Sequence, residues 1–324
     1  MSIKNYEKIP LKDKLLNKIM IYYSTIWKDK FEEGIHEKWL LNFESIQQQL
    51  NALYLLSKFM YFGNIELREL LKSVYRDLFK YPIVESIRKN NGDFIDINSI
   101  NNLFNAELKK TKFLGIGNPS ESGIHLLYYF RQENSLSKEN FINTHEIFNS
   151  KLIKDKDENG KPREYLKTEI KDKGVNRYVF LDDFCGSGDQ AIRYSGDIVE
   201  KIKKMKPDIE VNYLVLFSTE HGLNAVKKHT KFNNIETVFT LDESFKCFSD
   251  NSRYYSKIIN GIEKDFTRNF CHSYGRTLFP HSLGYKNCQL LLGLFHNTPD
   301  NTLPIFWSDV NNWKPIFKRY HKIN

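Results

Sequence analysis

The chain has 324 residues, of which 40% are hydrophobic, and 48 basic against 40 acidic residues give a formal net charge of +8. These proportions are typical of a globular protein with a sizeable core, and they exclude a disordered or fibrous chain. No stretch reaches the roughly 18 consecutive apolar residues of a membrane-spanning helix.

The four cysteines stand far apart in the sequence and form no CxxC pair: Cys185, Cys247, Cys271 and Cys288. This spacing argues against a disulfide framework or a zinc site, so we expect a reducing, cytoplasmic environment. The first residues, MSIKNYEKIPLKDK, lack the apolar segment of a secretory signal. The basic excess can attract nucleic acid or phosphorylated metabolites, but its lysines lie in short runs among acids, as a compositional bias would also place them.

The N-terminal third is predicted to be helical. Apolar residues recur every three or four positions through 39–60 and again through 65–89, and Gly63-Asn64 forms a turn between the two stretches. The aromatic side chains of this region are expected to pack between helices.

The pattern then changes to alternating strands and helices. Strands are predicted at 112–117, 177–181, 211–217 and 235–240, and helices at 124–132, 190–206 and 221–231. Residues 150–176 are polar and are predicted to form an exposed loop or flap. This alternation indicates an α/β fold with a parallel sheet. In such sheets ligands bind where strands lead into helices, which selects the loops 117–123 and 182–189.

The second of these loops has the most specific pattern, Val-Phe-Leu-Asp-Asp-Phe-Cys-Gly-Ser-Gly-Asp-Gln-Ala over residues 179–191. A glycine-rich turn at a helix N-terminus presents amides to a phosphate. Asp182 and Asp183 precede that turn, where carboxylates can bind hydroxyl groups or Mg²⁺. A phosphate group beside a pair of hydroxyl groups is the arrangement found in ribose 5-phosphate. If Asp182 and Asp183 bind those hydroxyl groups, we expect the two acids to be partly exposed at the mouth of the sheet.

This segment resembles the PRPP-binding loop of type I phosphoribosyltransferases. The resemblance implies that Asp182 and Asp183 bind the ribose hydroxyls, with Mg²⁺ accompanying PRPP. It implies that the 5-phosphate is held by backbone groups of the following residues: Gly186, Ser187, Gly188, Asp189 and Gln190. Two departures are visible. Gly186 stands where many members carry a carboxylate base, and Asp189 places a negative charge beside the phosphate.

Two other interpretations of the loop are open. The acids could cap an ordinary strand-to-helix turn. The Asp-Phe-Cys-Gly-Ser-Gly segment also suggests a methyltransferase nucleotide loop. Such a loop should follow the first strand of its sheet, whereas here a strand-loop-helix unit already precedes it.

The earlier loop lies where phosphoribosyltransferases bind pyrophosphate. The resemblance implies contacts from Ser120, Glu121, Ser122 and Gly123, through amides and the two hydroxyls. A serine that caps the following helix explains the same residues almost as well.

The C-terminal block adds a second resemblance. A strand is predicted at 289–295, followed by the polar loop 296–304. Leu283-Gly284-Tyr285 and the stretch His-Asn-Thr-Pro-Asp-Asn-Thr-Leu-Pro-Ile-Phe-Trp over 296–307 resemble the phosphoribosyltransferase-like family with a C-terminal extension, PRTase-CE, from bacterial conflict and phage-defence systems. Trp307 and Trp313 are expected in the core.

The resemblance implies a type I phosphoribosyltransferase-like sheet core at 106–245, between an N-terminal helical region at 1–105 and an α+β extension at 246–324 packed on the core. We expect Mg²⁺-dependent transfer of ribose 5-phosphate from PRPP to a nucleobase, nucleotide or nucleic acid, in anti-phage defence. The alternative is an inactive PRPP-sensing, nucleotide-sensing or nucleic-acid-binding module with defence-system partners. His281 and His296 flank turn-rich loops and are more often structural in such positions.

Overall fold

The chain is divided into two compact units. The computed structural model describes residues 10–27, 34–92, 94–117, 122–156 and 161–320. Unit 1 combines residues 1–67 with 241–324, and unit 2 comprises residues 68–240. This division differs from the predicted consecutive segments 1–105, 106–245 and 246–324, because the N-terminal residues and the C-terminal extension share one core. In the described part of the chain, no helix is long and apolar enough to cross a membrane.

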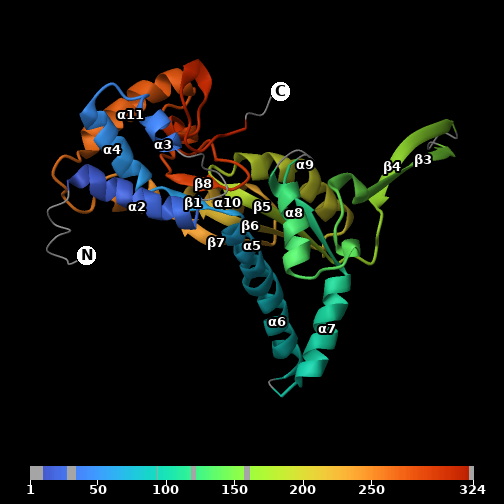
Figure 1. The fold of residues 1–324 in the computed structure, drawn as a ribbon. Helices are drawn as coiled ribbons and strands as arrows, with labels where there is room; N and C mark the ends of the chain where they lie inside the picture. The colour runs from blue at the N-terminus through green and yellow to red at the C-terminus, as the bar shows by residue number, and fades with distance from the viewer. Residues whose placement is uncertain (1–9, 28–33, 93, 118–121, 157–160, 321–324) are drawn as a thin grey trace. The chain divides into compact units, whose positions relative to one another are not determined.

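Unit 2 is built on a four-stranded sheet (Figure 1). Its strands, in the order β2-β5-β6-β7, are Thr111–Gly115, Arg177–Cys185, Glu210–Thr219 and Asn234–Leu241. β2 pairs with β5 in parallel, and β5 pairs with β6 in parallel. These pairings confirm the predicted α/β class with a parallel sheet.

Helices cover both faces of this sheet. They are α8 (Ser122–Glu133), α9 (Asp189–Met205) and α10 (Glu220–His229). Phe113 of β2 contacts Phe130 of α8 with ring centroids 5.1 Å apart, whereas Phe180 of β5 contacts Tyr194 of α9 at 6.2 Å. Phe113 pairs with Val179, the neighbour of Phe180, so α8 and α9 lie on opposite faces. The connections therefore change face between β2 and β5, the position where ligands bind in such sheets.

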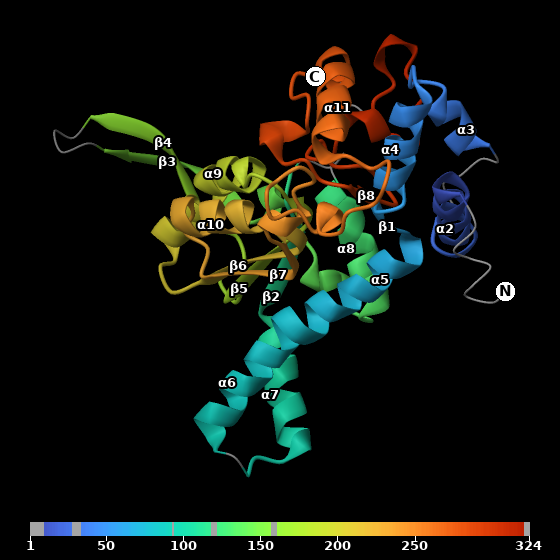
Figure 2. The same ribbon diagram turned by 90° about the vertical axis from the view of Figure 1, so that its left-hand side faces the viewer.

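A long helix precedes the sheet and changes its winding in the middle. α5 (Asn64–Ser73) continues through the π-helical segment η1 (Val74–Lys80) into α6 (Tyr81–Asn91), and α7 (Ile97–Lys109) packs beside α6 (Figure 2). Pro82 has no N–H for the carbonyl four residues earlier, which disfavours regular α winding there. The Tyr81 N–H instead bonds to the Arg76 carbonyl, five residues back.

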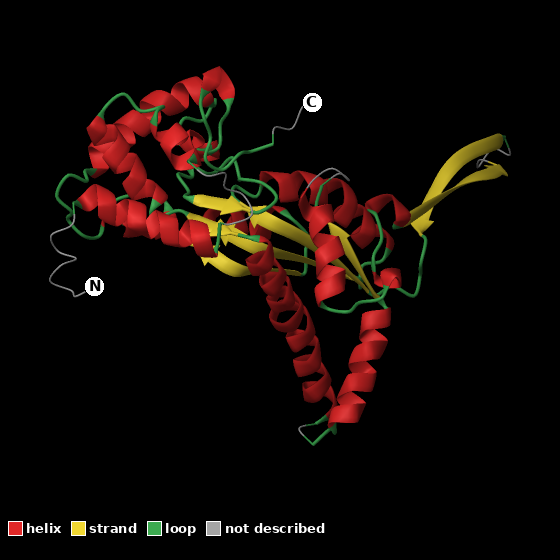
Figure 3. Cartoon of the chain, viewed as in Figure 1, coloured by secondary structure: helices red, strands yellow, loops and turns green. Residues whose placement is uncertain are grey.

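Most of the predicted loop or flap at 150–176 belongs to a β-hairpin (Figure 3). β3 (Phe148–Lys156) pairs with β4 (Pro162–Ile170) in antiparallel register. The predicted exposure is confirmed, but the strands were not predicted, because both of their faces are largely exposed and the sequence lacks apolar alternation. Two 3₁₀ turns, η2 (Lys138–Asn140) and η3 (Thr144–Glu146), lead into the hairpin.

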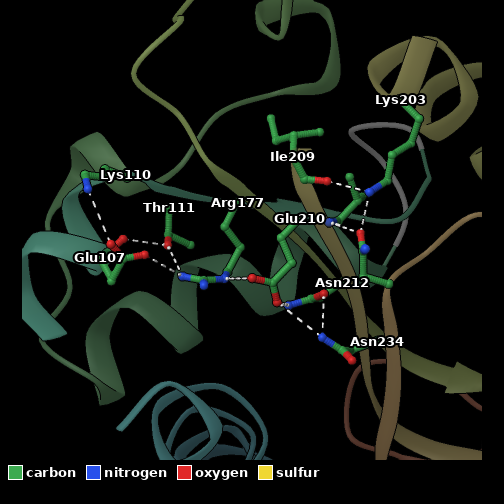
Figure 4. A network of polar contacts seen from close by, with 11 residues as sticks. Glu107, Lys110, Thr111, Arg177, Lys203, Ile209, Glu210, Asn212 and Asn234 are labelled. Carbon is green, nitrogen blue, oxygen red and sulfur yellow. Dashed lines mark hydrogen bonds and ion pairs between the residues drawn. The ribbon is translucent and has the colours of Figure 1, made fainter. Parts of the chain in front are cut away.

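A polar network joins the strands of unit 2 at their beginnings, the edge opposite the two candidate loops (Figure 4). Arg177 at the start of β5 donates from Nε to Glu210 at the start of β6, at 2.7 Å, and lies 3.7 Å from Glu107 of α7. The other Glu210 oxygen accepts from Asn212 and Asn234, which links β7 to the same acid. These side chains link the starts of β5, β6 and β7 to one another.

Unit 1 joins both ends of the chain. Its helices are α2 (Leu11–Thr25), α3 (Ile35–Leu40), α4 (Ile46–Leu56) and α11 (Lys264–Leu278). β1 (Met60–Phe62) pairs in parallel with β8 (Leu292–Leu294). Residues 60–62 extend because this long-range pairing outweighs the helical periodicity around them. The C-terminal half also contains the 3₁₀ turns η4 (Glu243–Phe245), η5 (Arg253–Tyr255), η6 (Tyr285–Asn287), η7 (Pro304–Phe306) and η8 (Val310–Asn312).

Aromatic side chains from both segments fill the core of unit 1. The indole of Trp39 stacks on Phe306 at 5.3 Å and donates to the Ile305 carbonyl at 2.7 Å. The Trp313 indole donates to the same carbonyl. Trp307 is fully buried, so the predicted core positions of Trp307 and Trp313 are confirmed.

Candidate functional site

The acidic pair lies within β5 instead of the loop that follows it. The strand was predicted to end at Leu181, but pairing with β6 continues from Asp182 opposite Val215 to Cys185 opposite Ser218. The connecting loop is therefore reduced to residues 186–188, and α9 begins at Asp189. The Asp182 and Asp183 side chains also interact with each other, so the two carboxyl groups lie close together at this end of the strand.

Asp182 is part of a buried polar group on the α9 face. Only 6% of its surface is exposed. One carboxylate oxygen accepts from the hydroxyl of Tyr213 on β6, at 2.7 Å, and the other accepts from the Asp183 N–H at 3.0 Å. Burial, and then the nearby Asp183 carboxylate, raise the pKa of Asp182 well above its usual value. Burial and the Asp182 charge likewise raise the pKa of the Cys185 thiol to about 11.

Asp183 is also buried, with 8% of its surface exposed. The expectation that both acids are partly exposed at the mouth of the sheet is therefore wrong. The sequence pattern placed them in the loop after the strand, and it did not reveal that β6 extends beside them. Their assignment to the ribose hydroxyls stays a prediction.

The loop after β5 is tightly packed against the start of α10. Gly188 has φ +81°, a conformation that side chains disfavour. A Cβ atom on Gly222 of α10 would lie 2.5 Å from the Gly186 carbonyl oxygen, so the two backbones approach more closely than any other residue allows. Thr219 and Ser218 at the end of β6 donate hydroxyl hydrogen bonds to the Gly186 and Cys185 carbonyls.

In the predicted phosphate-binding loop, the Ser187 hydroxyl already has a hydrogen-bond acceptor. The Ser187 hydroxyl donates to the Asp189 carboxylate at 2.9 Å, and both residues lie at the N-terminus of α9. Gly186, Ser187 and Gly188 are buried, whereas Gln190 is exposed. A phosphate at this helix terminus would have to replace or rearrange the Asp189 carboxylate.

The first loop reaches the same edge of the sheet. Ser120 and Glu121 lie outside the described residues, as does the side chain of Ser122, which begins α8. A Cβ atom on Gly123 would lie 2.6 Å from the Ile116 carbonyl oxygen and 3.2 Å from that of Leu181. The start of α8 therefore packs directly on the ends of β2 and β5, next to Asp182.

An open pocket of about 480 Å³ lies in unit 2 beside these loops. It is lined by Gly117 of the first loop and Gln190 of the second, and by Arg193, Tyr194 and Asp197 along α9. The sequence analysis did not identify the three α9 residues, whose only signal is their spacing along one helix. Asp182 and Asp183 do not contribute to its lining.

The acidic pair was also predicted to bind Mg²⁺. Among the described residues, no group of three or more His, Cys, Asp or Glu side chains could hold a metal ion. Both oxygens of Asp182 accept protein hydrogen bonds. The binding of Mg²⁺ by Asp182 and Asp183 stays a prediction.

The two C-terminal histidines belong to unit 1. The His281 ring packs on Tyr285, with centroids 4.8 Å apart, and on Phe279 at 5.7 Å. His296 follows β8, in the loop that leads to Asn297. These contacts of His281 are those of a structural side chain.

Comparison with known proteins gives one extensive match. The model of the PRTase-CE family matches residues 36–319. No curated protein matches the chain. Among solved structures, the chain is similar to a Helicobacter pylori xanthine-guanine-hypoxanthine phosphoribosyltransferase, with 10% identity, a TM-score of 0.27, and coverage of 56% of this chain and 91% of that one. It is also similar to an adenine phosphoribosyltransferase from Giardia lamblia, with 12% identity and a TM-score of 0.24. That match covers 52% of this chain and 83% of the Giardia chain.

Proposed function

Because the chain belongs to the PRTase-CE family, we propose that it transfers ribose 5-phosphate from PRPP to an acceptor. In this reaction the bond from C1 of the ribose to pyrophosphate breaks, and pyrophosphate leaves with the electron pair. A lone pair of the acceptor forms the new bond to C1, and the acceptor's proton passes to solvent. The observation that carries the proposal is the strand-acid-acid-Gly-Ser-Gly-helix arrangement at the carboxyl edge of a parallel sheet, where the connections change face.

The two acids have different roles in this proposal. Asp183 contacts the ribose hydroxyls after a local adjustment of the end of β5. Asp182 acts as a positioning residue, because its carboxylate holds the Asp183 N–H and is itself held by Tyr213. The amides of residues 186–190 bind the 5-phosphate, and those of the loop that ends at Gly123 bind pyrophosphate.

Magnesium enters this proposal with the substrate. Mg²⁺ is commonly bound through substrate phosphates with few protein ligands. We therefore assign no step of the reaction to a protein-bound ion. A cytoplasmic location belongs to the same proposal, since all four cysteines are free thiols.

The proposal is tested with Asp183→Asn and a matched control, Asp208→Asn, an exposed acid in the turn before β6. Calorimetry with PRPP and Mg²⁺ should show binding to the wild type and to the control. Binding to Asp183→Asn should fall at least tenfold, because a charge-assisted hydrogen bond contributes about 1.5–3 kcal/mol. Release of pyrophosphate should fall in parallel. Wild-type protein that does not bind PRPP, or an Asp183 variant that binds it normally, would refute the assignment.

A second function is favoured by three features of the loop. Asp182 and Asp183 are buried, Asp189 occupies the helix N-terminus, and Gly186 provides no carboxylate base. A module that senses PRPP or a nucleotide without turnover would bind ligand but release no pyrophosphate. A nucleic-acid-binding module would lose affinity steeply as salt increases.

The role in anti-phage defence is part of the first proposal and needs a cellular test. Cells that carry the complete locus should form fewer phage plaques than cells without it. If transfer from PRPP is the effector activity, Asp183→Asn should abolish this protection, whereas Asp208→Asn should retain it. Protection by the Asp183 variant would separate defence from transfer.

A further inference from the structure

The open pocket beside α9 presents two opposite charges that do not pair. Arg193 and Asp197 are four residues apart on α9, a spacing that places their side chains as neighbours on the helix surface. In the described part of the chain, neither forms an ion pair. Further along the same helix, Glu200 and Lys204 have the same spacing and do pair, at 3.9 Å.

The Arg193 guanidinium has capacity for further hydrogen bonds. Its Nε donates to the Asp189 carbonyl at 3.4 Å, a long contact. Four of its five N–H groups are not used by that bond, and the two terminal nitrogens can bind a carboxylate in a bidentate manner. Asp197 is exposed and can accept from an ammonium group. The pocket is therefore suited to a ligand that carries both charges.

A wall of the pocket outside α9 contains several apolar side chains. Ile124 and Leu127 of α8, Leu114 of β2 and Ile142 line the pocket, together with the polar residues Asn143, Thr144 and His145. A volume of about 480 Å³ lies within the range of small-molecule sites. An apolar body can thus lie on this wall while its charged groups face α9.

We propose that this pocket binds a free α-amino acid with a large apolar or aromatic side chain. Its carboxylate is held by Arg193, its ammonium group by Asp197, and its side chain by the wall that includes Leu127. Asp182 and Asp183 do not line the pocket, but Gly117 and Gln190 of the two candidate loops do. The bound amino acid would therefore lie next to the proposed phosphate sites.

The test uses calorimetry with L-phenylalanine and two analogues that each lack one charge. 3-Phenylpropionate has no ammonium group, and phenethylamine has no carboxylate. L-Phenylalanine should bind to the wild type, and each analogue should bind at least tenfold more weakly, because each leaves one charged partner unmatched. L-Leucine and L-tryptophan extend the test to other side chains. Absence of binding by all three amino acids, or equal binding of the analogues, would overturn the proposal.

The variants assign each charge to its residue. Arg193→Gln should weaken L-phenylalanine binding about tenfold and leave the weak binding of phenethylamine unchanged. Asp197→Asn should weaken L-phenylalanine binding equally and leave that of 3-phenylpropionate unchanged. The control Lys204→Gln lies on the same helix, outside the pocket, and should bind as the wild type does. Loss of binding by the control, or normal binding by both pocket variants, would contradict the assignment.

Discussion

At the scale of single residues, the most informative side chain is that of Asp182. It is an acid inside the sheet, and it is bonded to the Tyr213 hydroxyl and to the Asp183 N–H. Burial raises the pKa of Asp182, and the same burial followed by the Asp182 charge raises the pKa of Tyr213. The folded protein therefore binds a proton at Asp182 more tightly than the unfolded chain does, because the protonated acid carries no charge to bury.

This preference makes stability depend on pH in a defined direction. Because the folded-state pKa is raised, the contribution of Asp182 is fully present below the unfolded pKa of about 3.9 and is lost as pH rises through the folded value. Asp182→Asn cannot ionise and should not show this loss. Its melting temperature should exceed that of the wild type at pH 8, and the difference should narrow toward pH 4. An Asn variant that is less stable at pH 8, by thermal melts across this range, would contradict the assignment.

Sequence reasoning located the acidic pair but not its environment. Two acids between an apolar strand and a Gly-Ser-Gly turn were sufficient to select this edge of the sheet. Burial could not be predicted, because it depends on the length of β6 and on the hydroxyl of Tyr213, which is distant in sequence. The pocket residues Arg193 and Asp197 were missed for the same reason, since the apolar side chains that line the pocket with them come from α8 and β2.

At the scale of elements, Arg177 stabilises the parallel sheet at the edge where its strands begin. Its side chain is only 13% exposed and bridges Glu210 and Glu107, so it joins β5 to β6 and to α7. Glu210 also accepts from the two asparagines of β6 and β7. The hydrogen bonds and ion pairs of the network offset the desolvation of Arg177 and Glu210. Removal of Arg177 alone would leave the Glu210 carboxylate partly buried without its cation, which is unfavourable.

Arg177→Met should therefore destabilise unit 2 more than the loss of an exposed ion pair would. We expect a cost on the order of 1–3 kcal/mol in urea unfolding followed by circular dichroism, because Glu210 loses its cation while partly buried. The matched control Lys151→Met breaks the exposed pair with Glu169 on the hairpin and should cost less than about 0.5 kcal/mol. Similar costs for the two variants would show that the Arg177 network contributes little.

Elements were predicted well where one face is buried and poorly where none is. The two central strands of unit 2, β5 and β6, have continuous apolar runs, which is why the sequence identified them. The hairpin of β3 and β4 has Lys151 opposite Lys167 and Leu152 opposite Leu166, with the leucines 55% and 69% exposed. No burial pattern distinguishes such strands from a polar loop.

At the scale of the whole molecule, the order of residues along the chain does not match the order of the folded units. Unit 2 is one continuous segment, whereas unit 1 is assembled from both ends of the chain. The β1–β8 pairing and the Trp39 bond to the Ile305 carbonyl each connect the two ends. Local sequence patterns carry no information on such pairings, so the predicted boundaries at 105 and 245 followed the change of secondary-structure pattern along the chain.

This assembly predicts how fragments of the chain behave, and tryptophan fluorescence can follow it. All four tryptophans, Trp27, Trp39, Trp307 and Trp313, are buried in unit 1. The fragment 64–241 retains α5 and β7 whole and contains no tryptophan, so its folding is measured by circular dichroism.

Fragments 1–63 and 242–324 should each show the red-shifted emission of exposed indoles, because each contains only half of the core. Mixed together, they should give blue-shifted emission as Trp39 reaches Phe306 and Ile305. Replacing Trp39 by Ala in fragment 1–63 should weaken this association, since removal of a buried tryptophan costs about 3–5 kcal/mol. The exposed Leu41→Ala is the control and should associate normally. Blue-shifted emission from fragment 242–324 alone would show that the extension folds without the N-terminal helices.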